Sequence, residues 1–131
     1  MSQPQPRILI VDDDRLMITL LAGILRQEGY RLVDRALSGQ EALAKCRLAP
    51  PDIIFMDIEM PEMNGIETVE ALAEEGIGAQ IVLVSASPTT AYVHLAMKYN
   101  VARFVVKPMS PKTVGDAIAA CLKRAPPAAK T

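Results

Sequence analysis

The chain has 131 residues, of which 50% are hydrophobic and only 4% aromatic, and its formal net charge is −1. A chain of this length fits a single domain that folds without a disulfide or a structural metal. The balanced charge, and the lack of a basic stripe with interleaved aromatic residues, argue against direct binding of nucleic acid.

Short apolar runs alternate with helical patterns five times along the chain. The runs predict strands at residues 7–11, about 31–36, 53–56, 81–84 and 104–106. The second run is interrupted by Asp34 and Arg35, which fits an edge strand. Strands that alternate with helices form βαβ units, whose crossovers are right-handed in nearly all sheets. We therefore expect an α/β fold, a doubly wound parallel sheet with helices on both faces.

Capping residues mark the ends of the expected helices. Asp14 is placed to cap the first helix and Gly29 to end it. Ser38 and Glu41 have the spacing of a capping box at the start of the second helix, which Pro50 and the proline after it would end. By the same criteria, we expect the third helix to be capped by Asn64 and to end at Gly76. The fourth helix should be capped by Ser87, before Pro88, and should end at Asn100. The fifth should be capped by Ser110, before Pro111.

The cysteines and the two ends of the chain complete the predicted organisation. Cys46 and Cys121 continue apolar helical faces and have no ligand partners at metal-binding spacing, so both are expected in the core, in a reducing compartment. No apolar run approaches the roughly 18 residues of a membrane span, and the start lacks a signal-peptide pattern, so we expect a cytoplasmic protein. Residues 1–6 are expected to be disordered and 125–131 to be a flexible tail or linker stub, which leaves 7–124 as the folded domain.

Polar and charged residues follow four of the five expected strands. Asp12 and Asp13 follow the first strand, Asp57 the third, Ser85 the fourth and Lys107 the fifth. Each alone has an ordinary explanation, such as a turn, a helix cap or a satisfied backbone group. However, the carboxyl ends of parallel strands meet at one edge of a sheet, so these side chains should gather there. Clustered carboxylates repel unless a cation joins them, and Mg²⁺ prefers oxygen ligands. The pattern predicts a Mg²⁺ site with one exposed Asp beside it and a Lys opposite.

Over residues 7–124 the chain resembles the receiver domain of bacterial two-component response regulators. The matching stretches are residues 8–14 (Ile-Leu-Ile-Val-Asp-Asp-Asp), 54–65 (Ile-Phe-Met-Asp-Ile-Glu-Met-Pro-Glu-Met-Asn-Gly), 83–86 (Leu-Val-Ser-Ala) and 104–108 (Phe-Val-Val-Lys-Pro). The resemblance implies a flavodoxin-like sheet with strand order 2-1-3-4-5 and five helices. It also implies a phosphoryl group taken from a histidine kinase or a histidine phosphotransfer protein, and a signal passed to a downstream protein or a linked effector domain.

The resemblance assigns the acidic residues to roles. Asp57 matches the phosphoacceptor. Asp12 and Asp13 match the acid pair that holds Mg²⁺ together with Asp57, and Glu59 is expected to add its backbone carbonyl. Asp14 is expected to cap a helix rather than to bind the metal. Such a protein modifies only itself and turns over no free substrate, so it is not an enzyme in the usual sense.

The resemblance also assigns the residues that would sense the phosphoryl group. Ser85 and Lys107 match the hydroxyl and the cation that contact phosphoryl oxygens, and the bond between Lys107 and Pro108 is expected to be cis. Phosphorylation adds a charge of about −1.5 to −2. Ser85 would move toward it, and Phe104, the matching switch aromatic, would rotate inward, although a permanently buried Phe104 is the alternative. The signal would be read on the fourth helix, fifth strand and fifth helix.

That output surface lacks the ion-pair set of the DNA-binding regulators that dimerise through it. The loop before the fifth strand is Val101-Ala102-Arg103, without an acidic residue. We therefore expect a monomer or a weak dimer. His94, on the fourth helix, is expected to face solvent or to lie at the rim of a partner contact.

Two other functions share parts of this pattern. An Asp-based phosphohydrolase of the haloacid dehalogenase type also joins an Asp, Mg²⁺, a hydroxyl and a Lys, but there the nucleophile precedes the acid pair and a cap domain covers the site. A pseudo-receiver acting as a scaffold without phosphorylation usually lacks one of the five polar residues, and this chain keeps all five.

Overall fold

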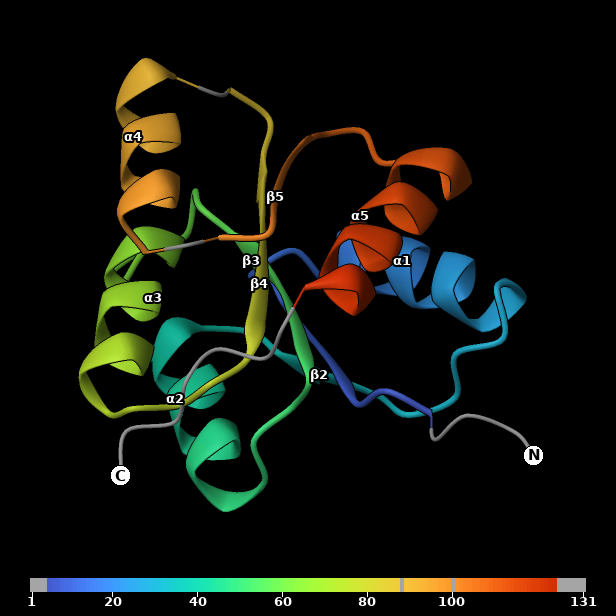
Figure 1. The fold of residues 1–131 in the computed structure, drawn as a ribbon, viewed down its shortest axis with the longest axis horizontal. Helices are drawn as coiled ribbons and strands as arrows, with labels where there is room; N and C mark the ends of the chain where they lie inside the picture. Colours follow the sequence, from blue (N-terminus) through green and yellow to red (C-terminus); the bar gives the residue numbers. More distant parts are fainter. Residues whose placement is uncertain (1–4, 88, 100, 125–131) are drawn as a thin grey trace.

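The computed structural model describes residues 5–87, 89–99 and 101–124. Its centre is a parallel sheet between two layers of helices (Figure 1). The strands are β1 (Ile8–Val11), β2 (Val33–Ala36), β3 (Ile53–Asp57), β4 (Gln80–Ser85) and β5 (Arg103–Val106). Their order is β2-β1-β3-β4-β5, and all four neighbouring pairs are parallel, as predicted.

Five helices connect and cover the strands. They are α1 (Arg15–Gln27), α2 (Gly39–Leu48), α3 (Gly65–Glu74), α4 (Thr90–Lys98) and α5 (Pro111–Lys123). Helices α1 and α5 lie on one face of the sheet, and α2, α3 and α4 lie on the other (Figure 1). The expected doubly wound architecture is therefore present.

The strand side chains alternate between two apolar cores, one on each face of the sheet. In β1, Leu9 and Val11 join the core under α2 and α3, while Ile8 and Ile10 join the core under α1 and α5. Because both faces are covered, the central strands are apolar throughout rather than at every second residue. Strand β2 lies at the edge, with Asp34 exposed, which confirms the edge position predicted for it.

Most of the predicted helix ends are confirmed. Asp14 caps α1, and Gly29 follows the C-cap with a φ of 93°, a conformation that glycine adopts at little cost. Asn64 and Ser110 form complete capping boxes at α3 and α5. Ser38 caps α2, but Glu41 accepts a hydrogen bond from the backbone N–H of Leu37 instead of closing the box at Ser38.

The predicted cap of α4 at Ser87 is wrong. Helix α4 begins at Thr90, and the hydroxyl of Thr89 accepts a hydrogen bond from the N–H of Tyr92 at 3.2 Å. The N–H of Ser87 instead donates to the hydroxyl of Ser85, a local side-chain bond that holds the chain outside the helix. Two hydroxyl residues could cap here, and the later one does. The roles predicted for Pro88 and Asn100 concern positions outside the described residues.

The cysteines lie where the apolar patterns put them. Cys46 is buried in the core on the α2 face, and Cys121 in the core on the α5 face. Burial raises the pKa of both thiols to about 11. Within the described residues, no helix is long and apolar enough to cross a membrane.

Candidate functional site

Three carboxylates meet at the carboxyl edge of the sheet. Strand β1 delivers Asp12 and Asp13, and Asp57 is the last residue of β3. One oxygen from each of them lies within 4.8 Å of the other two. Strands β1 and β3 are neighbours with Val11 opposite Met56, which brings the residues that follow them together. The cluster predicted from the strand ends is present.

Asp57 is buried, with only 3% of its surface exposed, so the exposed Asp expected beside the metal site is wrong. Strand β3 continues one residue farther than the apolar run indicates, and Asp57 pairs with Val84 inside the sheet. Asp12 is also buried, at 4% exposure, whereas Asp13 is exposed. The open side of the cluster is therefore the side of Asp13.

Lys107, which follows β5, bridges two of the carboxylates. Its Nζ lies 3.1 Å from Oδ2 of Asp12 and 3.1 Å from Oδ1 of Asp57. The pKa of Asp57 is raised to about 7, chiefly by burial and also by the charge of Asp12, against the lowering effect of Lys107. Burial alone would lower the pKa of Lys107, but Asp12 and Asp57 together raise it above its ordinary value. The lysine is therefore held as a cation.

Asp14 does not belong to the cluster in this arrangement. Its Oδ1 accepts a hydrogen bond from the N–H of Leu16 at 2.9 Å, and its own N–H donates to Oδ1 of Asp12 at 2.9 Å. The side chain thus caps α1 while its backbone orients Asp12. This agrees with the cap expected from the sequence.

The end of β4 supplies a hydroxyl that is already engaged. Ser85 is fully buried, and its Oγ donates to Oε2 of Glu59 at 2.6 Å. The neighbouring N–H of Ala86 donates to Oε1 of Glu59 at 3.0 Å. Sequence reasoning used Glu59 only for its backbone carbonyl and missed this contact. No local pattern of the sequence indicates this contact, because it depends on how the chain after β3 crosses the end of β4, where Asp57 lies opposite Val84.

A family model described as response regulator receiver domain matches residues 8–119. This chain belongs to the response regulator receiver family. Among curated relatives, the chemotaxis protein CheY of Thermotoga maritima is 39% identical over 112 residues, which cover 86% of this chain and 93% of that protein. The transcriptional regulatory protein PdtaR of Mycobacterium tuberculosis is 36% identical, and the match covers 90% of this chain and 57% of PdtaR.

Solved structures give the same fold. A complex of CheX and CheY with BeF₃ and Mg²⁺ from Borrelia burgdorferi matches with a TM-score of 0.83 and 28% identity, covering 90% of each chain. The chemotaxis protein CheY4 of Vibrio cholerae matches with a TM-score of 0.81 and 27% identity, covering 88% of this chain and 98% of CheY4.

The acidic cluster of this receiver domain fits a divalent cation. Lys107 pairs with two of the three carboxylates, those of Asp12 and Asp57, which leaves an excess of negative charge in the cluster. Oδ1 of Asp57 is buried and, within the described residues, has the ion pair to Lys107 but no hydrogen bond of good geometry. An all-oxygen donor set of this kind suits Mg²⁺.

Three further residues of the receiver domain lie next to the strand ends that form the site. Gly65 lies so close to β3 that a Cβ at this position would be 2.2 Å from the backbone oxygen of Asp57, which is why no side chain fits there. The bond between Lys107 and Pro108 is cis, as expected. Phe104 is half-buried against the core on the α3 face and lies opposite Leu83, two residues before Ser85.

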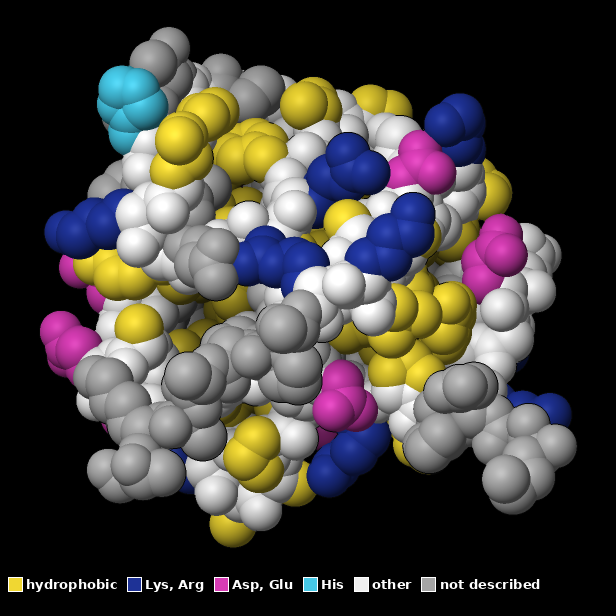
Figure 2. Space-filling model, in the orientation of Figure 1, with side chains coloured by type: hydrophobic (Ala, Val, Ile, Leu, Met, Phe, Trp, Pro, Cys, Tyr) yellow, Lys and Arg dark blue, Asp and Glu magenta, His cyan; other side chains and the backbone are white. Residues whose placement is uncertain are grey.

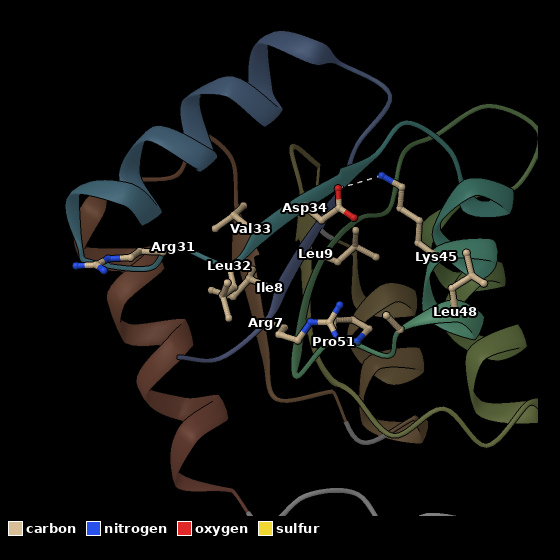
Figure 3. A pocket seen from close by; sticks show the side chains of 11 residues that line it. Arg7, Ile8, Leu9, Arg31, Leu32, Val33, Asp34, Lys45, Leu48 and Pro51 are labelled. Carbon is tan, nitrogen blue, oxygen red and sulfur yellow. Dashed lines mark hydrogen bonds and ion pairs between the residues drawn. The ribbon is translucent and has the colours of Figure 1, made fainter. Parts of the chain in front are cut away.

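A cavity of about 570 Å³ lies at the opposite end of the sheet from the acidic cluster. Its walls come from the amino ends of β1 and β2 and the end of α2, including Arg7, Leu32 and Leu48 (Figure 3). The ion pair between Lys45 and Asp34 closes one side of it. The cavity is therefore separate from the candidate site.

Proposed function

We propose that this receiver domain accepts a phosphoryl group on Asp57, with Mg²⁺ held beside it, and that the donor is a phosphohistidine on a histidine kinase or a histidine phosphotransfer protein. One observation carries the proposal. The carboxylate of Asp57 is gathered with those of Asp12 and Asp13 within 4.8 Å, and Lys107 contacts it from the other side. We take residues 7–124 as the receiver domain, with the residues beyond them as a terminal segment and a tail or linker.

Asp57 is the nucleophile in this proposal. One of its oxygens attacks phosphorus, the bond between phosphorus and the imidazole nitrogen breaks, and the electron pair of that bond stays on the imidazole. The product is an acyl phosphate, which water can later remove at the same place. Apart from this, the protein transforms no other molecule.

The surrounding residues reduce the repulsion between the nucleophile and the phosphoryl group. Lys107 offers its ammonium group to a phosphoryl oxygen, and the hydroxyl of Ser85 donates to another. Asp12, Asp13, Asp57 and the backbone carbonyl of Glu59 would hold Mg²⁺, which supplies positive charge against the phosphoryl oxygens. The complex of CheX and CheY from Borrelia burgdorferi, which contains BeF₃ and Mg²⁺, supports a site of this kind in a related fold.

The surface formed by α4, β5 and α5 is proposed to carry the signal to a partner protein or a linked effector domain. Figure 2 looks onto this face, where basic side chains lie among apolar ones. Val93 and Met97 of α4 and Val106 of β5 are among its exposed apolar residues. Phe104 of β5 is half-buried, and an inward rotation of its ring could follow a movement of Ser85. His94 is exposed on α4 and is available as a rim contact.

We further infer a monomer or a weak dimer that works in the cytoplasm, where histidine kinases present their phosphohistidine. Arg103 is exposed at the start of β5, and its loop offers no acidic residue for a reciprocal ion pair. Direct binding of nucleic acid or membrane is no part of the proposal.

Phosphorylation by a small acyl phosphate such as acetyl phosphate tests the proposal. Labelling should require Mg²⁺ and should be lost in the Asp57→Asn variant. Asp13→Asn should raise the Mg²⁺ concentration needed for labelling by about tenfold or more, because it removes an open-side ligand and so weakens Mg²⁺ binding. The matched control is Asp14→Asn, which removes a charge one residue away but keeps a residue that caps α1 well.

Labelling of Asp57→Asn at the wild-type level would place the phosphoryl group elsewhere. Absence of labelling in the wild-type protein, also with a phosphohistidine donor, would favour a scaffold that works without phosphorylation. Steady release of phosphate from a phosphomonoester would favour a phosphohydrolase.

A further inference from the structure

The carboxylate of Glu59 binds two hydrogen-bond donors at the end of β4. Its Oε2 accepts from the hydroxyl of Ser85 at 2.6 Å, and its Oε1 accepts from the N–H of Ala86 at 3.0 Å. The two oxygens of one carboxylate thus take one donor each. Hydrogen bonds to an ionised acceptor are short and strong compared with neutral ones.

The position of these two donors gives the contact its significance. Ser85 ends β4 directly beyond Val84, which pairs with Asp57 in the neighbouring strand. Adjacent strands lie about 5 Å apart, so a group attached to Asp57 would reach the hydroxyl of Ser85. A hydroxyl and a backbone N–H that converge on one point form a place for an anion. At present the anion in that place is the side chain of Glu59.

We propose that Glu59 is an internal competitor for the phosphoryl group, occupying the hydroxyl of Ser85 and the N–H of Ala86 until a phosphoryl group on Asp57 displaces it. The proposal rests on the proposed function of Asp57. It assigns the Glu59 side chain a role separate from its backbone carbonyl.

Glu59 and a phosphoryl group cannot accept hydrogen bonds from these two donors at the same time. The hydroxyl of Ser85 has one hydrogen to donate, so its bond to Glu59 excludes a bond to a phosphoryl oxygen. The N–H of Ala86 is in the same position. Glu59 is itself exposed, so its side chain can turn into solvent without disturbing the core. Phosphorylation therefore exchanges one anion for another at the end of β4.

The same contact also holds the connection between β4 and α4. The hydroxyl of Ser85 accepts from the N–H of Ser87 at 3.0 Å while it donates to Glu59, and Ala86 is held by Glu59 directly. Departure of Glu59 would release this connection at the moment when Ser85 turns to the phosphoryl group. The competitor thus keeps the unphosphorylated arrangement of the loop that leads to α4.

The experiment measures binding of beryllofluoride, a stable analogue of the phosphoryl group, in the presence of Mg²⁺. The variants are Glu59→Ala, which removes both acceptors, and Glu59→Gln, which removes the charge but keeps one acceptor oxygen. The control is Glu62→Gln, which removes an exposed charge three residues farther along the same loop. We expect Glu59→Ala to bind beryllofluoride about tenfold more tightly than wild type, the gain for two lost competing bonds. The beryllofluoride affinity of Glu59→Gln should lie between those of wild type and Glu59→Ala. The affinity of Glu62→Gln should stay within about twofold of wild type.

A second readout tests the contact without any ligand. In the metal-free protein, Glu59→Ala should increase the hydrogen exchange rate of the Ala86 amide by about tenfold, since it removes the acceptor of that N–H. Glu62→Gln should leave that rate unchanged.

Each other result overturns the proposal in a distinct way. Equal affinities of wild type and Glu59→Ala would show that Glu59 does not compete. An equal gain in beryllofluoride affinity in Glu59→Gln and Glu62→Gln would mean that the effect is general charge repulsion rather than competition by Glu59. If no variant bound beryllofluoride with Mg²⁺, the proposed function of Asp57 would itself fail, and the competitor with it.

Discussion

At the scale of single residues, Asp57 carries two opposed requirements. In the proposed reaction it must be ionised to attack phosphorus, yet it is buried, and its pKa is raised to about 7 by this burial together with the charges of Asp12 and Glu59. Lys107 offsets part of this effect with its ammonium 3.1 Å away. A divalent cation at the cluster would complete the compensation, so the reactive form of Asp57 is linked to the metal.

This linkage predicts how the stability of the metal-free protein depends on pH. The folded pKa of Asp57 is about 7 and its ordinary value is 3.8, so the folded state binds the proton more tightly than the unfolded state. The corresponding stability is present below the ordinary value and is lost as the pH rises through about 7. In EDTA, the melting temperature of Asp57→Asn relative to wild type should therefore be higher at pH 8 than at pH 5, by about 3 °C or more.

Thermal unfolding followed by circular dichroism measures this difference. Asp14→Asn is the control, since it replaces a carboxylate that caps α1 at the surface. A difference between Asp57→Asn and wild type that is the same at both pH values would mean that Asp57 titrates in its ordinary range when folded.

The candidate residues could be gathered from the sequence because parallel strands place their last residues at one edge. Asp12, Asp57, Ser85 and Lys107 each follow or end a strand, so their convergence depends only on the strand direction. The burial of Asp57 depended on one more paired residue in β3, which the apolar run does not reveal. The contact of Glu59 with Ser85 depended on a loop conformation, for which the chain has no local pattern.

At the scale of secondary-structure elements, the connection from β4 to α4 joins the site to the proposed output surface. At its start the hydroxyl of Ser85 accepts from the N–H of Ser87, and at its end the hydroxyl of Thr89 caps α4. Cap residues elsewhere predicted the helix starts correctly, as at Asp14, Asn64 and Ser110. Here Ser87 and Thr89 are both suitable caps, and the hydrogen bond from the N–H of Ser87 to the hydroxyl of Ser85 holds Ser87 outside the helix.

The position of this cap can be tested with two single substitutions. Thr89→Ala should lower the free energy of unfolding by about 0.5–2 kcal/mol, because the N–H of Tyr92 loses its acceptor. Ser87→Ala should change it by less than about 0.5 kcal/mol, as is usual for exposed residues. Urea unfolding at equilibrium measures both. The reverse order of effects would restore Ser87 as the cap.

At the scale of the whole molecule, the sheet separates two cores and two ends. The site lies at the carboxyl edge, the cavity beside Arg7 and Leu32 lies at the other end, and the α4–β5–α5 surface flanks the site. The α/β class followed from alternating strands and helices. The strand order did not follow from alternation alone, because the same alternation permits several orders, and it came from the resemblance to receiver domains.

Both cores should be closed to solvent, and the cysteines report on this. Cys46 lies in one core and Cys121 in the other, and burial raises the pKa of each thiol to about 11. At pH 8 only about one thiol in a thousand would be ionised, and the thiolate is the reactive form. A disulfide reagent should therefore modify the native protein at least about a hundredfold more slowly than the protein in denaturant. Rapid reaction of one thiol in the native state would show that its core opens.

The central claim is that Asp57 becomes an acyl phosphate, and chemical trapping tests it most directly. Borohydride reduces an acyl phosphate of aspartate to homoserine and leaves free carboxylates intact, so it identifies both the residue and the type of bond. After treatment with a phosphoryl donor and Mg²⁺, peptide mass spectrometry should find homoserine at position 57 of the wild-type protein and at no other aspartate, and none in samples with excess EDTA. Homoserine at another aspartate, or its formation at position 57 without Mg²⁺, would contradict this account.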